Sequence, residues 1–183
     1  MVLQAGLFVL GSLILAWLSR AALRQPRAHG FARFFAWEAI LALLVLNGPV
    51  WFDDRFAPHQ LISWVLLYTS IGVLIAGLYL LRRVGRPGQA RADAELFAFE
   101  KTSTLVTVGI FKYIRHPMYS SLLLLAWGVF FKQPGLVGLL CAIAATLCLW
   151  LTAQRDEQEC LAYFGDDYRR YMQRSKRFIP FVF

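Results

Sequence analysis

The sequence predicts an all-α integral membrane protein with five transmembrane helices, the last two of which form a helical hairpin. Hydrophobic residues make up 58% of the 183 residues and charged residues only 16%, whereas an average soluble domain is about a quarter charged. The mean hydropathy is +0.53. Apolar stretches recur along the chain, and a helix of roughly 20 apolar residues crosses the hydrocarbon of a bilayer. The composition excludes intrinsic disorder, and three cysteines are too few for a disulfide scaffold.

The predicted spans are separated by polar loops or turns. Glu38 is the one charged residue inside them, and the fourth span is short. Pro134 and Gly135 place a tight turn at 132–135, between the last two spans. The first span could instead be a signal peptide, although no basic residues precede it. The five spans lie at residues 2–18, 34–52, 61–81, 117–131 and 133–153.

The distribution of Lys and Arg predicts the orientation of the chain in the membrane. Five crossings place 17 of the 19 basic residues on one side, in the loops at 19–33 and 82–116 and in the tail after residue 153. We therefore expect the N-terminus outside and the C-terminus in the cytosol, in a prokaryotic inner membrane. The net charge of +8 is then a topology signal and a contact with lipid headgroups, and no nucleic-acid partner is expected.

The hairpin brings two polar regions together on the cytosolic side, where any chemistry should lie. We expect one domain over residues 1–183, with three helices in 1–90 and the functional part in 91–183. In the first polar region, residues 104–107 are β-branched or apolar and suit an extended or loop conformation. Gly109 allows a turn, and Pro117 suits the first position of a helix.

That helix start, together with Arg115 and His116, forms a possible anion site. Aromatic residues beside it could hold an adenine ring or a cation: Phe111, Tyr113 and Tyr119. The alternative interpretation is a topology anchor followed by an ordinary helix start, with the tyrosines at the membrane interface.

The second polar region contains a short acidic run. Read as a helix, it places Asp156 and Glu159 on one face, and Glu157 and Cys160 on another. Gly165 ends this helix, and a further helix follows with acidic residues at its start. The alternative is a solvated helix whose acids balance the arginines of the tail. The apolar segment 178–183 would lie on the bilayer or pack as a lid.

Other chemical motifs are weak or absent from the sequence. It has no G-x-G-x-x-G motif after a strand and no phosphate-binding loop. The cysteines are interpreted as packing residues, since no histidine cluster accompanies them, and no metal site is expected. His29 and His59 are interpreted as isolated loop residues.

From about residue 100 onward, the order and spacing of motifs resemble the isoprenylcysteine carboxyl methyltransferases and, more loosely, the membrane phospholipid N-methyltransferases. The first 90 residues match only as unspecific membrane helices. The matching features are Thr-Leu-Val-Thr at 104–107, Gly109, Phe111, Arg-His-Pro-Met-Tyr at 115–119, the acidic pair at 156–157, Phe164, Gly165, Asp167, Tyr168, Tyr171 and Phe-Ile-Pro at 178–180.

The resemblance implies a methyltransferase that binds S-adenosyl-L-methionine in a cytosolic pocket formed by the 82–116 segment and the C-terminal helices. Arg115 and Glu157 are expected to act in the reaction. Eukaryotic members of the family have an arginine near the acceptor carboxylate where this chain has Thr152, and Arg155 is the expected substitute. The residues that the resemblance assigns to the cofactor are Ser103, Thr104, Leu105, Val106, Phe111, His116, Pro117, Met118, Tyr119, Asp156 and Glu157.

The implied acceptor is a lipophilic small molecule or a prenylated substrate that enters sideways from the bilayer, between helices and near the second to fourth of them. Glu38 is a candidate lining residue, because an intramembrane acid is a functional hypothesis by default. The reaction most like the family's is carboxyl methylation of an isoprenylcysteine. The alternatives are a phospholipid or other lipid N-methyltransferase, a nicotinamide-dependent membrane reductase of the sterol reductase type, and a non-catalytic membrane protein.

Overall fold

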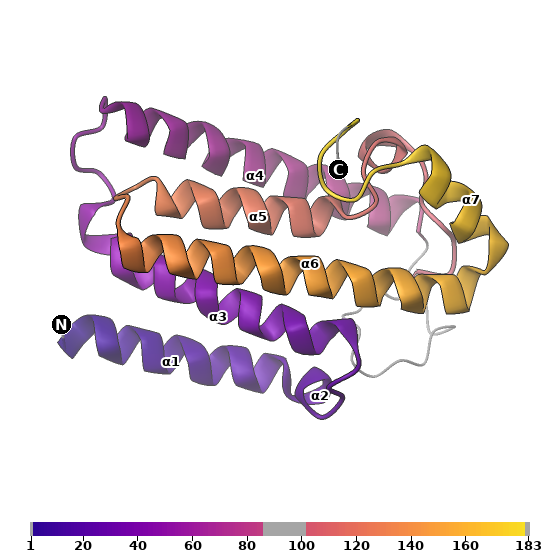
Figure 1. Ribbon diagram of the computed structural model, residues 1–183, viewed down its shortest axis with the longest axis horizontal. Helices are drawn as coiled ribbons and strands as arrows, with labels where there is room; N and C mark the ends of the chain where they lie inside the picture. The colour runs from indigo at the N-terminus through magenta and orange to yellow at the C-terminus, as the bar shows by residue number, and fades with distance from the viewer. Residues whose placement is uncertain (1, 86–101, 182–183) are drawn as a thin grey trace.

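The computed structural model describes residues 2–85 and 102–181, and all its regular elements there are helices (Figure 1). The central part of the predicted 82–116 region, with Arg86, Arg91 and Lys101, lies outside the described residues. The elements are α1 (Val2–Leu18), α2 (Arg20–Leu23), α3 (His29–Asn47), η1 (Gly48–Val50), α4 (Pro58–Arg83), η2 (Gly109–Lys112), α5 (Pro117–Phe130), α6 (Leu136–Phe164) and α7 (Asp166–Arg174).

The long helices run side by side in an elongated bundle, and α7 lies at one end of it (Figure 1). The principal packed pairs are α1 with α3, α3 with α6, α5 with α6, and α4 with α5. Helices α5 and α6 are joined by a tight turn, so the predicted hairpin is present. The polar region before the hairpin and the polar region after it therefore meet at the α7 end of the bundle.

Each predicted span corresponds to a helix in the structure. Three helical stretches are long and apolar enough to cross a membrane: His29–Val50, Pro58–Arg83 and Leu136–Phe164. Helices α1 and α5 are apolar but shorter, with 17 and 14 residues. These are the helices of a membrane protein, while the number of five spans stays a prediction. Helix α3, which corresponds to the second predicted span, begins at His29, five residues before the predicted start, and ends at Asn47.

Helix α6 continues without interruption through the apolar span and the acidic run. It ends at Gly165, whose φ of +59° suits glycine. Asp166 and Asp167 occupy the first turn of α7, where the helix dipole favours negative charge. The acidic run is therefore carried on the same rigid helix as the hairpin.

Small residues allow the helices to approach closely, as is common in membrane bundles. Side-chain hydroxyls also bond across helices: Ser63 Oγ donates to the Gly128 carbonyl at 2.7 Å, and Ser70 Oγ donates to the Ser121 carbonyl at 2.7 Å. These bonds join α4 to α5. The fully buried alanines of the α3, α5 and α6 interfaces are Ala36, Ala126, Ala142, Ala145 and Ala153.

The turn between α5 and α6 carries a buried lysine. The Lys132 side chain is 1% exposed, and its Nζ donates to Gln60 Oε1 at 3.0 Å. The ammonium also lies 3.3 Å from the centroid of the Trp64 ring, a cation–π arrangement. Burial lowers the pKa of Lys132 from its ordinary value. This lysine thus fixes the hairpin turn against α4.

We expect the substitution Gly109→Ala to lower the free energy of unfolding. Gly109 has a φ of +60°, and an added Cβ would lie 2.6 Å from Leu80 Cδ1. A left-handed conformation costs an L-residue about 1–2 kcal/mol, and displacing Leu80 adds to this cost. Thermal unfolding of the detergent-solubilised protein measures the change. Gly135→Ala is the control, because nothing lies within 4 Å of its added Cβ; an equal effect in both variants would contradict the prediction.

Candidate functional site

The segment that precedes α5 is held in place by the tail that follows α7. The two run parallel through a single bridge between Ile114 and Lys176. The Arg115 N–H donates to the Lys176 carbonyl at 2.7 Å, and the Lys176 N–H donates to the Tyr113 carbonyl at 2.9 Å. The Tyr171 hydroxyl donates to the Phe111 carbonyl at 2.6 Å. The two polar regions predicted to be neighbours are therefore in direct contact.

Glu157 lies at the centre of this contact. Its carboxylate is 5% exposed and accepts from Arg115 Nε at 2.9 Å and from Arg177 at 2.6 Å. His116 Nε2 lies 3.3 Å from the same carboxylate. The Arg115 guanidinium also donates to the Met172 carbonyl at 3.2 Å. One buried acid thus joins α6, the segment before α5 and the C-terminal tail.

Asp156 faces a different group of side chains. The Tyr119 hydroxyl donates to Asp156 Oδ2 at 3.1 Å, and His116 Nδ1 lies 3.4 Å from the same oxygen. Cys160 Sγ lies 3.5 Å from the other oxygen. The rings of His116 and Tyr119 are stacked, with centroids 5.3 Å apart. His116 therefore bridges the two neighbouring acids through its two ring nitrogens.

This position sets the pKa of the His116 imidazole. Burial by itself would lower the pKa, but the hydrogen bonds that Asp156 and Glu157 accept from the imidazole, together with their negative charges, outweigh it, so the pKa is raised above 6.5. Burial also raises the pKa of the Tyr168 and Tyr171 phenols. The site therefore combines an imidazole whose pKa is raised, two carboxylates and two phenols whose pKa values are raised.

A cavity opens beside Asp156 and His116. Its empty space, including the solvent at its mouth, is about 740 Å³. Among the described residues that line it, Asp156 is the one acid. The lining residues are His29, Leu81, Thr102, Leu105, Val106, Phe111, Arg115, His116, Pro117, Met118, Tyr119, Asp156, Cys160, Phe164, Tyr168 and Tyr171.

The cavity brings together most of the residues that the sequence assigned to the cofactor. The exceptions are Ser103, Thr104 and Glu157, which are not part of its lining. Thr104 lines an adjoining groove that also contains Lys112, Arg170 and Arg174. Leu81, Thr102 and Cys160 line the cavity without having been predicted, because single apolar or polar residues carry no motif. Phe164, Tyr168 and Tyr171 also line it and belong to the motifs that carry the resemblance, although no cofactor contact was assigned to them.

The structure places Arg155 and Glu38 away from the cavity lining. Arg155 donates to the Pro26 carbonyl at 2.8 Å and to the Ala28 carbonyl at 3.4 Å. Glu38 accepts a 2.6 Å hydrogen bond from Ser12, which ties α1 to α3. In this structure neither side chain lines the cavity, and an acceptor contact by either stays a prediction.

The tail divides into a packed part and an exposed part. Phe178 is 7% exposed and packs against Tyr119 and Leu149, and its carbonyl accepts from Ser120 Oγ at 2.9 Å. Phe181 is 79% exposed. The two last residues of the predicted apolar segment lie outside the described residues.

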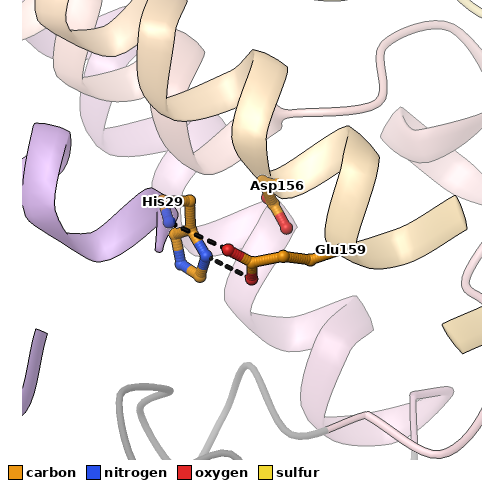
Figure 2. Close-up of side chains that lie close together, drawn as sticks. All are labelled: His29, Asp156 and Glu159. Atoms are coloured by element: carbon orange, nitrogen blue, oxygen red, sulfur yellow. Dashed lines mark hydrogen bonds and ion pairs between the residues drawn. The ribbon is translucent and has the colours of Figure 1, made fainter. Parts of the chain in front are cut away.

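The interpretation of His29 and His59 as isolated loop residues is wrong, and His59 lies in the first turn of α4. His29 begins α3, is 1% exposed and lines the cavity. Its Nδ1 lies 2.7 Å from Glu159 Oε2, and its backbone N–H donates to Glu159 Oε1 at 2.9 Å (Figure 2). The partner is 130 residues away in the sequence, so no local pattern indicates the pair.

His29, Asp156 and Glu159 also form a group that could approach a metal ion. One potential ligand atom from each lies within 4.8 Å of the others. The double contact between His29 and Glu159 already accounts for this geometry as an ion pair. We therefore assign no metal to these side chains.

We expect the stability of the protein to fall as the pH rises through the raised pKa of His116. Because the pKa of His116 is higher in the folded state than the ordinary value of 6.5, the protonated imidazole contributes its full stabilisation at pH values below 6.5. This contribution is lost as the pH rises through the folded-state pKa and the imidazole loses its proton. Thermal unfolding measured on both sides of this pH window tests the prediction. His116→Gln removes the titrating group, and a pH dependence that persists unchanged in this variant would contradict the assignment.

Comparison with known proteins identifies the family. A sequence profile of the phospholipid methyltransferase family matches residues 62–166, which include most of α4, the segment between α4 and α5, and all of α5 and α6. The chain belongs to this family. The expected relation to the isoprenylcysteine carboxyl methyltransferases and phospholipid methyltransferases is confirmed.

Individual relatives are methyltransferases with different acceptors in their names. The chain is 34% identical to protein-S-isoprenylcysteine O-methyltransferase B of Arabidopsis thaliana over 157 residues, which are 82% of this chain and 76% of the relative. It is 27% identical to methanethiol S-methyltransferase 1 of Bradyrhizobium diazoefficiens, over 64% of this chain and 39% of the relative.

A probable protein-S-isoprenylcysteine O-methyltransferase of Oryza sativa is 27% identical over 65% of this chain and 63% of the relative. The chain thus spans less than two thirds of the length of the Bradyrhizobium and Oryza relatives. No solved structure is significantly similar to the chain.

Proposed function

We propose that the chain is a membrane methyltransferase that uses S-adenosyl-L-methionine and methylates a lipophilic acceptor. The observation that carries the proposal is the cavity at the end of the bundle, where Asp156, His116 and several aromatic rings converge. Family membership supports the same activity. The proposal extends to one domain whose cavity faces the cytosol, with the N-terminus on the other side of the membrane.

The residues of the cavity suit the chemical groups of the cofactor. Asp156 would take the ammonium group or the ribose hydroxyls, because it is the one acid among the described lining residues. Phe111 and Tyr168 offer aromatic faces for the adenine ring, and apolar side chains from α4 and α5 exclude water. When bound, the cofactor supplies a methyl group from its sulfonium sulfur, and the thioether is the leaving group.

The protein's contribution to the reaction is then mainly positioning. Aligning two bound reactants removes much of the entropic barrier of a bimolecular step. His116 and Tyr119 hold the Asp156 carboxylate in place, and the Glu157 cluster fixes the segment that precedes α5. A carboxylate acceptor needs no general base, whereas an amine acceptor must lose a proton.

We propose that the acceptor is a carboxylate on a prenylated thioether, because isoprenylcysteine O-methyltransferases recur among the relatives. The test is transfer of labelled methyl groups from S-adenosylmethionine to three defined acceptors: S-farnesylcysteine, phosphatidylethanolamine and methanethiol. A base-labile product on farnesylcysteine is the expected result. A base-stable product on the amine or the thiol would contradict the proposed acceptor and retain the proposed activity.

A further inference from the structure

The N-terminal part of the chain reaches the cavity through His29. The family match begins at residue 62, so α1 to α3 lie outside it. His29 is fully buried and lines the cavity together with Asp156. It is the one described residue of the lining that precedes α4 in the chain. This side chain therefore connects α1 to α3, which precede the family match, to the site.

Two side chains of α6 hold the start of α3. Ala28, at the N-cap of α3, makes no side-chain capping bond. The Glu159 carboxylate supplies one from α6, since it accepts both the backbone N–H and Nδ1 of His29. A carboxylate at this position also complements the helix dipole. One turn earlier on α6, Arg155 binds the Pro26 and Ala28 carbonyls.

Asp156 lies between these two anchoring residues. In Figure 2 the Glu159 side chain extends from α6 to His29, and Asp156 lies three residues earlier on the same helix. Any rotation or displacement of this turn of α6 would move Asp156 relative to His116 and Tyr119. The contact between His29 and Glu159 thus fixes the acid that faces the cavity.

We propose that His29 is a positioning residue of the cofactor site, which acts by holding Glu159 and so fixing the turn of α6 that carries Asp156. Through this contact, helices α1 to α3 set the affinity for the cofactor. The inference rests on the proposed function, because the ligand concerned is S-adenosylmethionine or its product.

The test is the affinity of the purified full chain for S-adenosylhomocysteine, measured by calorimetry. Asparagine carries an amide N–H near the position of Nδ1, whereas glutamine carries one near Nε2. We expect His29→Asn to bind within about 3-fold of the wild type. His29→Gln and His29→Ala should bind about 10-fold more weakly, as expected for a lost charge-assisted bond. His59→Ala is the control, because His59 lies in the first turn of α4 and outside the cavity lining.

Steady-state kinetics give a second readout. His29→Ala should raise the KM for S-adenosylmethionine about 10-fold and leave kcat within about 3-fold, because the reacting groups are untouched. Equal affinity in the wild type and His29→Ala would overturn the inference, as would an asparagine variant no better than alanine. Wild-type affinity that is lost with a chelator would also overturn it, by assigning the three side chains to a metal. A wild type that binds no S-adenosylhomocysteine would instead contradict the proposed function.

Discussion

Glu157→Gln is expected to destabilise the protein by about 3–5 kcal/mol, the usual cost of removing one partner from a buried ion pair. The carboxylate is 5% exposed and is shared by Arg115, Arg177 and His116. Glutamine preserves the shape and removes the charge, so the two partly buried guanidinium groups would lose their shared anion. The tail and the segment before α5 would then lose the group that joins them to α6.

Unfolding by heat or denaturant in detergent measures this effect. Asp166→Asn is the matched control, because it also removes one carboxylate charge but breaks an exposed pair with Arg169. Exposed pairs contribute about 1 kcal/mol or less. Equal stability losses in the two variants would show that the buried cluster has no special role in the fold.

Asp156→Asn is expected to weaken binding of S-adenosylhomocysteine by about 10- to 100-fold, because charged hydrogen bonds contribute about 1.5–3 kcal/mol. Asp156 is the acid that faces the cavity, and His116 and Tyr119 hold it there. The fold should survive, since asparagine can still accept from the Tyr119 hydroxyl. Calorimetry measures the affinity of Asp156→Asn for S-adenosylhomocysteine. Asp166→Asn is the control, because it removes an exposed carboxylate outside the cavity lining. Unchanged affinity in Asp156→Asn would mean that the cofactor does not use this carboxylate.

These two variants divide the acidic pair into a structural acid and a ligand-facing acid. Both residues could be found from the sequence, because the acidic pair and the Phe-Gly that follows it match the motif order and spacing of the methyltransferase family. Their different roles could not be found in this way. Consecutive residues of a helix point about 100° apart, and the direction that faces the cavity depends on where the tail places Arg177.

The same physical limit explains why the contacts of Arg155 and His29 could not be predicted from the sequence. Arg155 is adjacent to the acidic pair in the sequence, but in the structure it binds backbone carbonyls of the linker before α3. His29 and Glu159 are 130 residues apart, and only the packing of α3 on α6 brings them together. Long-range pairs of this kind leave no periodic or local signal.

The helices were largely predictable because hydrophobic length and helix-breaking residues determine them locally. Pro117 begins α5 and Gly165 ends α6 as expected. The continuity of α6 was not apparent, since a change from apolar to charged residues marks a membrane boundary but does not interrupt backbone hydrogen bonds. The next residue that ends the helix is Gly165.

The most direct test of the account is calorimetric binding of S-adenosylhomocysteine to the purified protein, with NADPH and the variant His116→Ala measured beside it. We expect the nucleoside to bind the wild type, NADPH not to bind, and His116→Ala to retain its fold but lose affinity, because the imidazole holds Asp156 at the cavity. Binding of NADPH without S-adenosylhomocysteine would contradict the methyltransferase assignment and favour a reductase. Unchanged affinity in His116→Ala would place the cofactor elsewhere.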